Sequence, residues 1–420
     1  MCSSDLGGFG KLQVELRITA PAVTAICDFE AEPAPVKPPR ITFRNDRTMM
    51  VDGRPVFPIW ASRADNGQIP ELAAMGFNFV TDMKQFYQMG SKNYQPGDEI
   101  RAGEFLNRHG VKKMAMLNWE FMNKFGKVHG AEFGETLRRE LPLWRGDQNI
   151  LIYYLMDEPP PVMMGTVAEG YRLLKDIDPD RPVAVCLNHL ERPELAEAIR
   201  KAGKFADIVM VDPYPFPYRG IDQAENQLRL ARELTGRNTP LMYWMQGFSY
   251  STDRGKKDLG RYPTRDELRC EAFLAICHDA RGLGVFTMNW LDLGRIDHSR
   301  RAFWNAMRQV ITEVREFTPM LLSETHCAGG RYDKLPLHTF QSVCGNDLYF
   351  VVVNSSANPL RVRIGLPKLT EKEPVDEFFE SRLLFPENST IVDQFTPLGV
   401  HVYRIVNRQK TEPVRLTIEK

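Results

Sequence analysis

The stretch ILIYYLMDEPPP, residues 150–161, places two adjacent carboxylates between a continuous apolar run and three prolines. A short apolar run bounded by a turn signal is typical of a strand that is buried on both faces, as in a parallel sheet. Proline has no backbone N–H to donate, so the prolines end the strand just after Asp157 and Glu158. These two acids are therefore expected at the carboxyl end of a buried parallel strand.

Similar short apolar runs recur on both sides of this strand and alternate with amphipathic segments. The eight candidate strands are VFPIW (56–60), FNFVTD (77–82), VKKMAMLNW (111–119), ILIYYLMD (150–157), PVAVCLNH (182–189), ADIVMVD (206–212), PLMYWMQ (240–246) and GVFTMNW (284–290). Helical patterns separate or follow them at residues 69–76, 99–110, 166–178, 192–203, 224–236, 264–282 and 300–317. Strand-helix units that begin near residue 56 and finish near 317 predict an α/β fold, a (β/α)₈ TIM barrel. An open doubly wound sheet shows the same alternation and is the structural alternative.

The chain before the barrel has a different texture. Residues 11–19, KLQVELRIT, alternate as a half-buried strand does, and a stretch rich in Pro and Ala follows to about Arg40 like a linker. We expect the opening Met-Cys-Ser-Ser-Asp-Leu to be a cloning or sequencing scar, with the natural N-terminus missing. From Ile41 the pattern predicts a short hairpin that turns at Asp52-Gly53 and leads into the first barrel strand.

After Pro319 the pattern changes to period-two or continuous β segments. These are HTFQSVCGNDLYFVVVNSS (338–356), LRVRIGL (360–366) and VHVYRIV (400–406), with turns at Gly345-Asn346 and Asn358-Pro359. They predict a small all-β sandwich that supports the barrel, with carbohydrate binding as the alternative role. The predicted division is a scar, strand stub and linker at 1–40, the barrel at 41–320, the sandwich at 321–410 and a tail at 411–420.

Composition narrows the class of partner. The 420 residues carry 54 acidic and 54 basic side chains, for a formal net charge of +0, so no field of one sign attracts nucleic acid or an anionic membrane. No apolar run is long enough to span a bilayer. A neutral substrate agrees better with this balance of charges. The sequence does not predict the oligomeric state.

The sequence contains no motif for binding a metal ion or a phosphate group. The seven cysteines show no zinc spacing and are expected to be buried free thiols, and His189 and His298 are isolated from other ligands. No GxxxxGK[ST] loop is present, and no G-x-G-x-x-G opens a helix after a strand. We therefore expect neither a metal nor another cofactor.

The candidate site follows from the barrel itself, because residues at the carboxyl ends of barrel strands face the active site. The inventory from the first strand to the last is Trp60, Arg63, Asp82, Asn118, Trp119, Asp157, Glu158, Asn188, His189, Asp212, Tyr214, Trp244, Gln246, Asn289, Trp290 and Asp292. Aromatic faces pack against the C–H surface of a sugar ring, while acids and amides bind its hydroxyls. This mixture predicts a carbohydrate substrate.

The same residues carry a resemblance to a known family. ILIYYLMDEPPP resembles the Tyr-x-x-Asp-Glu-Pro segment of clan-A-like barrel glycoside hydrolases. RYPTRDELRCEAFLAICHDARGLGVFTMNW (261–290) resembles the stretch that runs into their eighth strand, and FTPLGVHVYRI (395–405) resembles the close of their C-terminal β-domain. The resemblance covers roughly Thr42 to Val406 and rests on the order of these pieces. By analogy alone we expect a secreted or periplasmic protein.

The resemblance implies that Glu158 is the general acid/base and that Asp157 supplies charge or a substrate hydrogen bond. Taken alone, an Asp-Glu-Pro sequence can equally be a solvated helix cap. Retaining members carry a nucleophilic Glu at the end of strand seven, where this chain has Gln246. Three alternatives follow: Asp212 or Asp292 serves as nucleophile or base, the substrate assists while Gln246 orients it, or the barrel binds sugar without cleaving it.

For several candidates the structural role competes with the functional one. Asp212 and Asp292 could be turn-capping residues. His189 is expected as a hydrogen-bonding partner rather than a catalyst. Of Trp60, Trp119, Trp244 and Trp290, two are expected to touch ligand and two to be buried. The leading prediction is a glycosidase that cleaves O-glycosidic bonds of a β-linked oligo- or polysaccharide, and the alternative is a catalytically silent carbohydrate-binding barrel.

Overall fold

The structure is a computed structural model and describes residues 12–18, 23–29, 39–83, 97–117, 130–250, 260–288, 298–411 and 414–419. The chain divides into two compact units, Met1–Arg40 and Ile41–Lys420. In the first unit, β1 (Leu12–Ile18) pairs antiparallel with β2 (Val23–Phe29). The strand at 11–19 was predicted, whereas β2 lies where a linker was expected. The linker prediction is wrong there because residues 23–29 contain no proline and keep enough apolar alternation to complete a hairpin.

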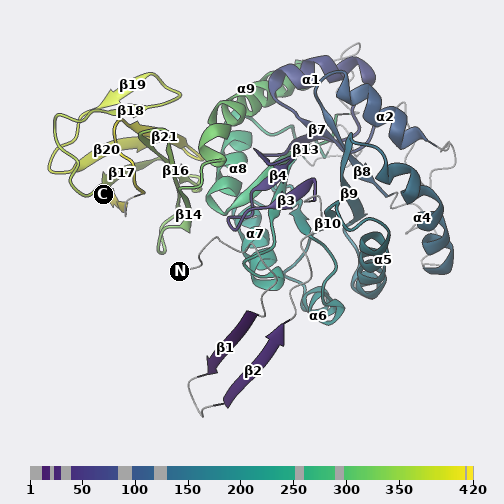
Figure 1. The fold of residues 1–420 in the computed structure, drawn as a ribbon. Coiled ribbons are helices and arrows are strands. Elements are labelled where there is room, and N and C mark those ends of the chain that lie inside the picture. Colours follow the sequence, from purple (N-terminus) through teal and green to yellow (C-terminus); the bar gives the residue numbers. More distant parts are fainter. Residues whose placement is uncertain are drawn as a thin grey trace. The chain divides into compact units, whose positions relative to one another are not determined.

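The second unit contains a closed parallel barrel with the strand order β10-β11-β12-β13-β6-β7-β8-β9 (Figure 1). All eight predicted strands are present, so the TIM-barrel prediction is confirmed and the open sheet is excluded. The barrel strands are β6 (Ile59–Ala61), β7 (Phe79–Val80), β8 (Lys112–Met116), β9 (Ile150–Asp157), β10 (Val183–Leu187), β11 (Ile208–Val211), β12 (Leu241–Gln246) and β13 (Ala280–Phe286).

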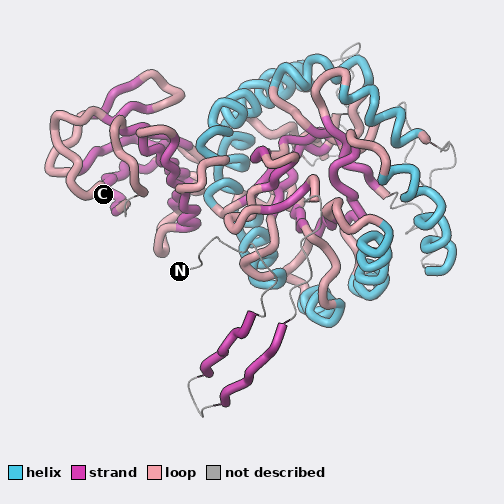
Figure 2. Tube along the Cα trace, in the orientation of Figure 1, coloured by secondary structure: helices cyan, strands magenta, loops and turns pink. Residues whose placement is uncertain are grey.

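Helices surround the barrel strands on the outside, as the tube view shows (Figure 2). They are α1 (Ile69–Met75), α2 (Asp98–Asn107), α4 (Gly130–Arg145), α5 (Met164–Ile177), α6 (Pro193–Ala202), α7 (Asp222–Thr235), α8 (Arg265–Cys277) and α9 (His298–Leu321), with short 3₁₀ turns at Asn66–Gln68 and Pro161–Met163. No helix was predicted at α4, which starts at a glycine and holds Pro142 inside it. Both residue types disfavour a helix interior, so packing against the neighbouring α5 overrides local propensity.

The boundary between α8 and β13 differs from the prediction. The helical pattern was extended to Gly282, but α8 ends at Cys277 and β13 already begins at Ala280. Gly282 and Gly284 lie inside the strand, where the ring of Trp60 crosses them, and a Cβ at Gly284 would overlap that ring. These glycines therefore mark a close approach inside the barrel rather than the end of a helix.

The barrel interior and its outer layer form separate apolar clusters. The interior cluster includes Trp60, Met114, Met210 and Trp244, and it also contains Ile41 and Met49 from a small antiparallel sheet. That sheet consists of β3 (Ile41–Phe43), β4 (Met49–Val51) and β5 (Arg54–Val56). β4 and β5 join through Asp52-Gly53, whose φ values of 50° and 75° suit a type I′ turn, so the predicted hairpin is confirmed.

The C-terminal region forms two antiparallel sheets packed around one apolar cluster, which confirms the predicted sandwich. One sheet has the order β14-β15-β16-β21-β18-β19 and the other β20-β17-β22. The strands are β14 (His326–Arg331), β15 (Leu337–Cys344), β16 (Asp347–Asn354), β17 (Leu360–Gly365), β18 (Val375–Glu377), β19 (Arg382–Leu384), β20 (Thr390–Phe395), β21 (Val400–Ile405) and β22 (Arg415–Glu419). Residues after 410 were expected to be a tail, but β22 pairs with β17 and completes a sheet.

Contacts between α8 and the sandwich link the barrel to its C-terminal sheets. The guanidinium of Arg269, on α8, donates to the carbonyl of Val400 on β21. Arg331 of β14 forms a bidentate ion pair with Glu225 of α7. None of the helices in the described ranges has the length and apolarity that a bilayer crossing requires.

Candidate active site

A pocket of about 540 Å³ opens at the carboxyl ends of the barrel strands. This is the end at which active sites of TIM barrels lie. Among the predicted residues it is lined by Arg63, Asp82, Asp157, Glu158, Asn188, His189, Asp212, Tyr214 and Trp244. Residues that the sequence reasoning missed also line it, among them Ser62, Thr81, Met116, Tyr154, Arg219, Tyr250 and Phe286.

Glu158 stands at the mouth of this pocket, directly after β9, and its side chain is exposed. The Nδ2 group of Asn188 donates to Glu158 Oε1 at 2.7 Å and to the carbonyl oxygen of Asp212 at 3.1 Å. The carboxyl of Asp212 lies close enough to Glu158 for their charges to interact, although Asp212 is only 3% exposed and its Oδ1 has no hydrogen-bond partner among the described residues. The ends of three neighbouring strands, β9, β10 and β11, thus bring together a solvent-facing acid, an amide and a buried acid.

Burial and mutual repulsion keep protons in this carboxyl cluster. Burial raises the pKa of Asp212 well above its usual range, and the nearby charges of Glu158 and Asp157 raise it further. Burial, with a smaller contribution from the charge of Glu158, raises the pKa of Asp157 to about 6, although the Tyr154 hydroxyl and the charge of Arg63 act in the opposite direction. At neutral pH the cluster therefore holds both ionised and protonated carboxyl groups, the combination that acid/base catalysis needs.

Two residues beneath the acids complete the cluster: Tyr154, the Tyr of the Tyr-x-x-Asp-Glu-Pro segment, and Cys186, and neither was among the predicted site residues. The Tyr154 hydroxyl, from inside the barrel, donates to Asp157 Oδ1 at 2.5 Å. Cys186 of β10 is fully buried, and its sulfur lies within 4.8 Å of oxygens from both Asp157 and Asp212. Burial raises the pKa of the Cys186 thiol well above its usual value, so the thiol stays protonated. Tyr154 lies three residues before Asp157 and Cys186 two residues before Asn188, whereas the predicted site residues were taken from the last positions of each strand.

Arg63 forms the opposite edge of the pocket. Its backbone N–H donates to Asp82 Oδ1 at 2.8 Å, and its guanidinium lies 3.6 Å from Asp82 Oδ2 and over the ring of Phe286. Thr81 also donates to Asp82, so this acid is committed to holding the Arg63 loop. Asp82 therefore holds Arg63 in position and has a role different from that of the acids that follow β9 and β11.

Aromatic side chains line the floor and one wall. Trp60 and Trp244 meet edge to face at a centroid distance of 5.0 Å, with Trp60 fully buried beneath and Trp244 at the pocket. Tyr214 and Tyr250 contribute to the wall, and the Tyr250 hydroxyl donates to the carbonyl of Tyr214 at 3.4 Å. The pocket thus presents aromatic surface next to acids, while Trp60 packs inside the barrel without lining it.

Four non-glycine residues of the pocket adopt a left-handed backbone. Their φ values are 51° for Arg63, 44° for Glu158, 56° for His189 and 44° for Tyr214, and each follows the end of a different barrel strand. Such residues are uncommon and strained, and they gather at functional sites where the surrounding structure holds them. The backbone turns sharply after each of these strands, and the four side chains all line the pocket.

Gln246, at the position expected for a nucleophile in the family, lies outside the pocket lining. The side chain is fully buried; its Oε1 accepts from Phe216 N at 3.0 Å, and its Nε2 donates to the carbonyls of Phe216 and Phe248. This amide holds two loop segments together, so the geometry gives it no contact with a substrate. The predicted site residues Asn118, Trp119, Asn289, Trp290 and Asp292 lie outside the described residues.

Comparison with known proteins gives structural matches only. No protein-family model and no curated protein sequence matches the chain. A glycoside hydrolase family 5 protein from Bacteroides vulgatus is similar over 88% of this chain and 93% of its own, with 11% identity and a TM-score of 0.59. A putative α-galactosidase/melibiase from Bacteroides fragilis covers 95% and 86% at 14% identity and a TM-score of 0.53, and an Anoxybacillus α-amylase covers 82% and 90% at 11% and 0.52. The expected resemblance is confirmed at the level of the fold: the chain shares its barrel architecture with these solved glycoside hydrolase structures.

Proposed function

We propose that the protein is a glycoside hydrolase that cleaves β-linked oligo- or polysaccharides, with Glu158 as its general acid/base. The observation that carries this proposal is the position of Glu158 at the pocket mouth, exposed, bonded to Asn188 and beside the buried carboxyl of Asp212. The aromatic surface of Trp244 and Tyr214 next to these acids suits a sugar ring.

In this proposal Glu158 protonates the glycosidic oxygen as the leaving group departs. Asp212 is only 3% exposed at the pocket lining and keeps its proton at neutral pH, so it acts as a proton reserve beside Glu158. Asp157, ionised above pH 6, lies close enough to the same cluster to stabilise positive charge that develops on the sugar. A protonated Asp212 can neither attack the sugar nor activate water, so of the two predicted candidates for the second catalytic carboxylate this assignment favours Asp292.

The experiment compares wild type with Glu158→Gln on a panel of aryl glycosides and β-glucans, with Glu169→Gln, an exposed acid on α5, as the matched control. General acid catalysis contributes about 10²- to 10⁴-fold, so Glu158→Gln should lose at least about 100-fold in kcat/KM while Glu169→Gln keeps full activity. Equal hydrolysis by wild type and Glu158→Gln would remove Glu158 from the mechanism.

A catalytically silent sugar-binding barrel is the second candidate. The observation that favours it is Gln246, a buried amide bonded to backbone groups at the strand end where retaining enzymes carry a nucleophile. Calorimetric titration with the same glucans separates the two functions. Binding without hydrolysis of any panel member would establish the silent barrel.

A further inference from the structure

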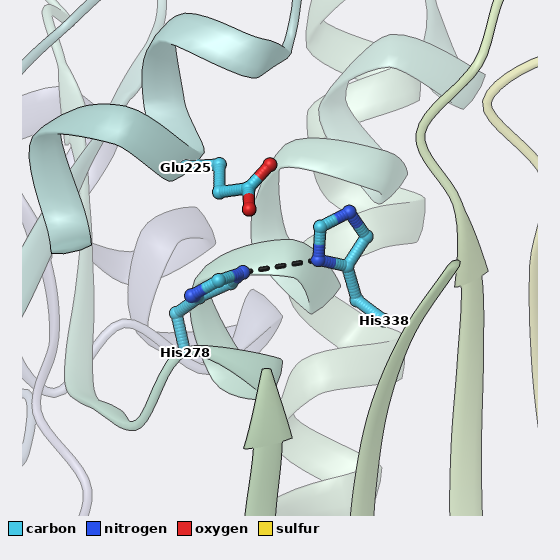
Figure 3. A group of neighbouring side chains, drawn as sticks. All are labelled: Glu225, His278 and His338. Atoms are coloured by element: carbon cyan, nitrogen blue, oxygen red, sulfur yellow. Dashed lines mark hydrogen bonds between the residues drawn. The ribbon is translucent and has the colours of Figure 1, made fainter. Parts of the chain in front are cut away.

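Outside the pocket, two histidines and a glutamate meet where the barrel helices contact the sandwich (Figure 3). Glu225 comes from α7, His278 follows the end of α8, and His338 lies on β15. One ligand atom from each residue lies within 4.8 Å of the other two. The three residues are 53 to 113 positions apart in the chain, so their proximity is a product of the tertiary fold.

We propose that Glu225, His278 and His338 bind a divalent transition metal, with Zn²⁺ as the expected ion, which links α7 and α8 to the sandwich. Two imidazole nitrogens and a carboxylate oxygen form a donor set that zinc uses in proteins, with a fourth position for water. Glu225 and His278 are half-buried, so an ion and a water molecule can reach the group from solvent.

The geometry of the imidazoles agrees with one bound ion. His278 Nε2 and His338 Nδ1 point at each other across 3.0 Å. Two nitrogens bound to tetrahedral zinc at about 2.05 Å lie roughly 3.3 Å apart, so the ion is admitted by a shift of a few tenths of an ångström, loss of the shared proton and a tilt of both rings toward the ion. His338 Nε2 lies 3.0 Å from Ser355 Oγ, a contact that fixes the ring and directs Nδ1 at the site.

The electrostatic surroundings do not prevent coordination. Burial lowers the pKa of His278 to about 4 and that of His338 to about 2, so both rings are neutral. Both oxygens of Glu225 accept from Arg331 Nε, at 2.8 and 2.9 Å, and Oε2 also accepts from Nη2, but a carboxylate has about four lone-pair sites and can hold an arginine and a metal together. Arg331 also donates to Asp222 at 3.0 Å, which offsets its charge.

Two other groups of potential ligands occur among the described residues, and each is better explained without an ion. In the sandwich, Arg382 contacts all three potential ligands, Glu377, Asp393 and His401, whereas Arg331 binds only the carboxylate of the cluster proposed here. Asp157, Cys186 and Asp212 belong to the proposed active site. The cluster of Glu225, His278 and His338 is therefore the best candidate for a metal site among the described residues.

The test uses the purified full chain after treatment with a chelator. Calorimetric titration with Zn²⁺ should give one equivalent bound, and Co²⁺ should give the visible d–d absorption of a low-coordinate nitrogen and oxygen site. His278→Gln and Glu225→Gln should abolish both signals, and added Zn²⁺ should raise the Tm of wild type but not of these variants. His109→Gln, which changes a histidine far from the cluster in sequence, and Cys186→Ser, which alters the ligand group at the barrel pocket, should keep both signals.

The proposal is overturned if wild type binds no stoichiometric Zn²⁺, if both cluster variants bind as wild type does, or if only Cys186→Ser loses the metal. Circular dichroism shows whether each variant is folded. Glu225 is half-buried on a helix surface, so Glu225→Gln keeps the test valid even where a histidine variant fails to fold. None of these readouts depends on hydrolysis, so the metal site and the proposed glycosidase activity stand or fall separately.

Discussion

Asn188 donates a hydrogen bond of 2.7 Å from its side-chain amide to Oε1 of Glu158, which joins the end of β10 to the end of β9. The same amide donates to the carbonyl of Asp212 at 3.1 Å, and Asn188 Oδ1 accepts from His189 N at 2.8 Å. Asn188 is therefore a positioning residue whose amide holds Glu158 in one orientation.

Asn188→Ala should lower kcat more than it changes KM, because the lost bond orients the acid rather than the substrate. A hydrogen bond to a charged group contributes about 1.5–3 kcal/mol, so the loss in kcat/KM should be roughly 10- to 100-fold. Steady-state kinetics on the best substrate of the panel measures the split. A change confined to KM, or an equal loss explained by a lower Tm, would contradict the positioning role.

The carboxyl of Asp157 should appear in the pH profile. Its pKa of about 6 means that it is ionised above pH 6 and neutral below. If its charge stabilises the developing oxocarbenium ion, kcat/KM should fall as the pH drops through 6. Asp157→Asn should lack this acid limb and lose about 100-fold on the plateau. Asp176→Asn, an exposed acid on α5, should keep the wild-type profile. An acid limb that persists in Asp157→Asn would assign it to another group.

Glu271 on α8 should make the stability of the barrel depend on pH. It is fully buried, accepts from the Tyr243 hydroxyl at 2.9 Å, and burial raises its pKa to about 8. Between pH 4.5 and 8 the unfolded chain releases this proton while the folded chain keeps it, so rising pH favours unfolding. The shift corresponds to about 4 to 5 kcal/mol over that window.

Glu271→Gln removes the titration and keeps an oxygen for Tyr243. Urea unfolding of both proteins at pH 5 and pH 8 should therefore show the wild type losing about 4 kcal/mol relative to the variant. Parallel pH dependence of the two proteins would show that Glu271 ionises in the folded barrel without cost.

Gly284 should tolerate no side chain, because the ring of Trp60 occupies the position that a Cβ would take. Gly284→Ala forces Trp60 or the β13 backbone to move inside a packed barrel, and we expect a loss of at least about 3 kcal/mol or a failure to fold. Gly165→Ala on α5, where nothing lies within 4 Å of the added Cβ, is the control and should be neutral or slightly stabilising. Melting temperatures of both variants against wild type decide the point, and an unchanged Tm for Gly284→Ala would be inconsistent with this packing.

The barrel and the end of it that holds the pocket could be predicted from local sequence patterns. Eight apolar runs separated by amphipathic helices leave few topologies, since parallel strands need crossover helices and the connections are right-handed. Polar residues at the ends of those runs then had to meet, and Glu158, Asp157, Asp212, His189 and Tyr214 do line one pocket. The hairpin at Asp52-Gly53 was equally local, because both of its residues adopt positive φ. These features depend on neighbours in the chain.

The partners of the site residues could not be predicted, because they depend on how segments distant in sequence pack together. Cys186 and Tyr154 became part of the acid cluster through the register between β9, β10 and β11, which no single strand encodes. The side chain of Gln246 forms hydrogen bonds with the backbone groups of Phe216 and Phe248 and does not line the pocket. The meeting of Glu225, His278 and His338 required the sandwich to dock on α7 and α8. Such contacts arise from packing between segments distant in sequence, where burial sets hydrogen-bonding partners and proton affinities that residue spacing does not contain.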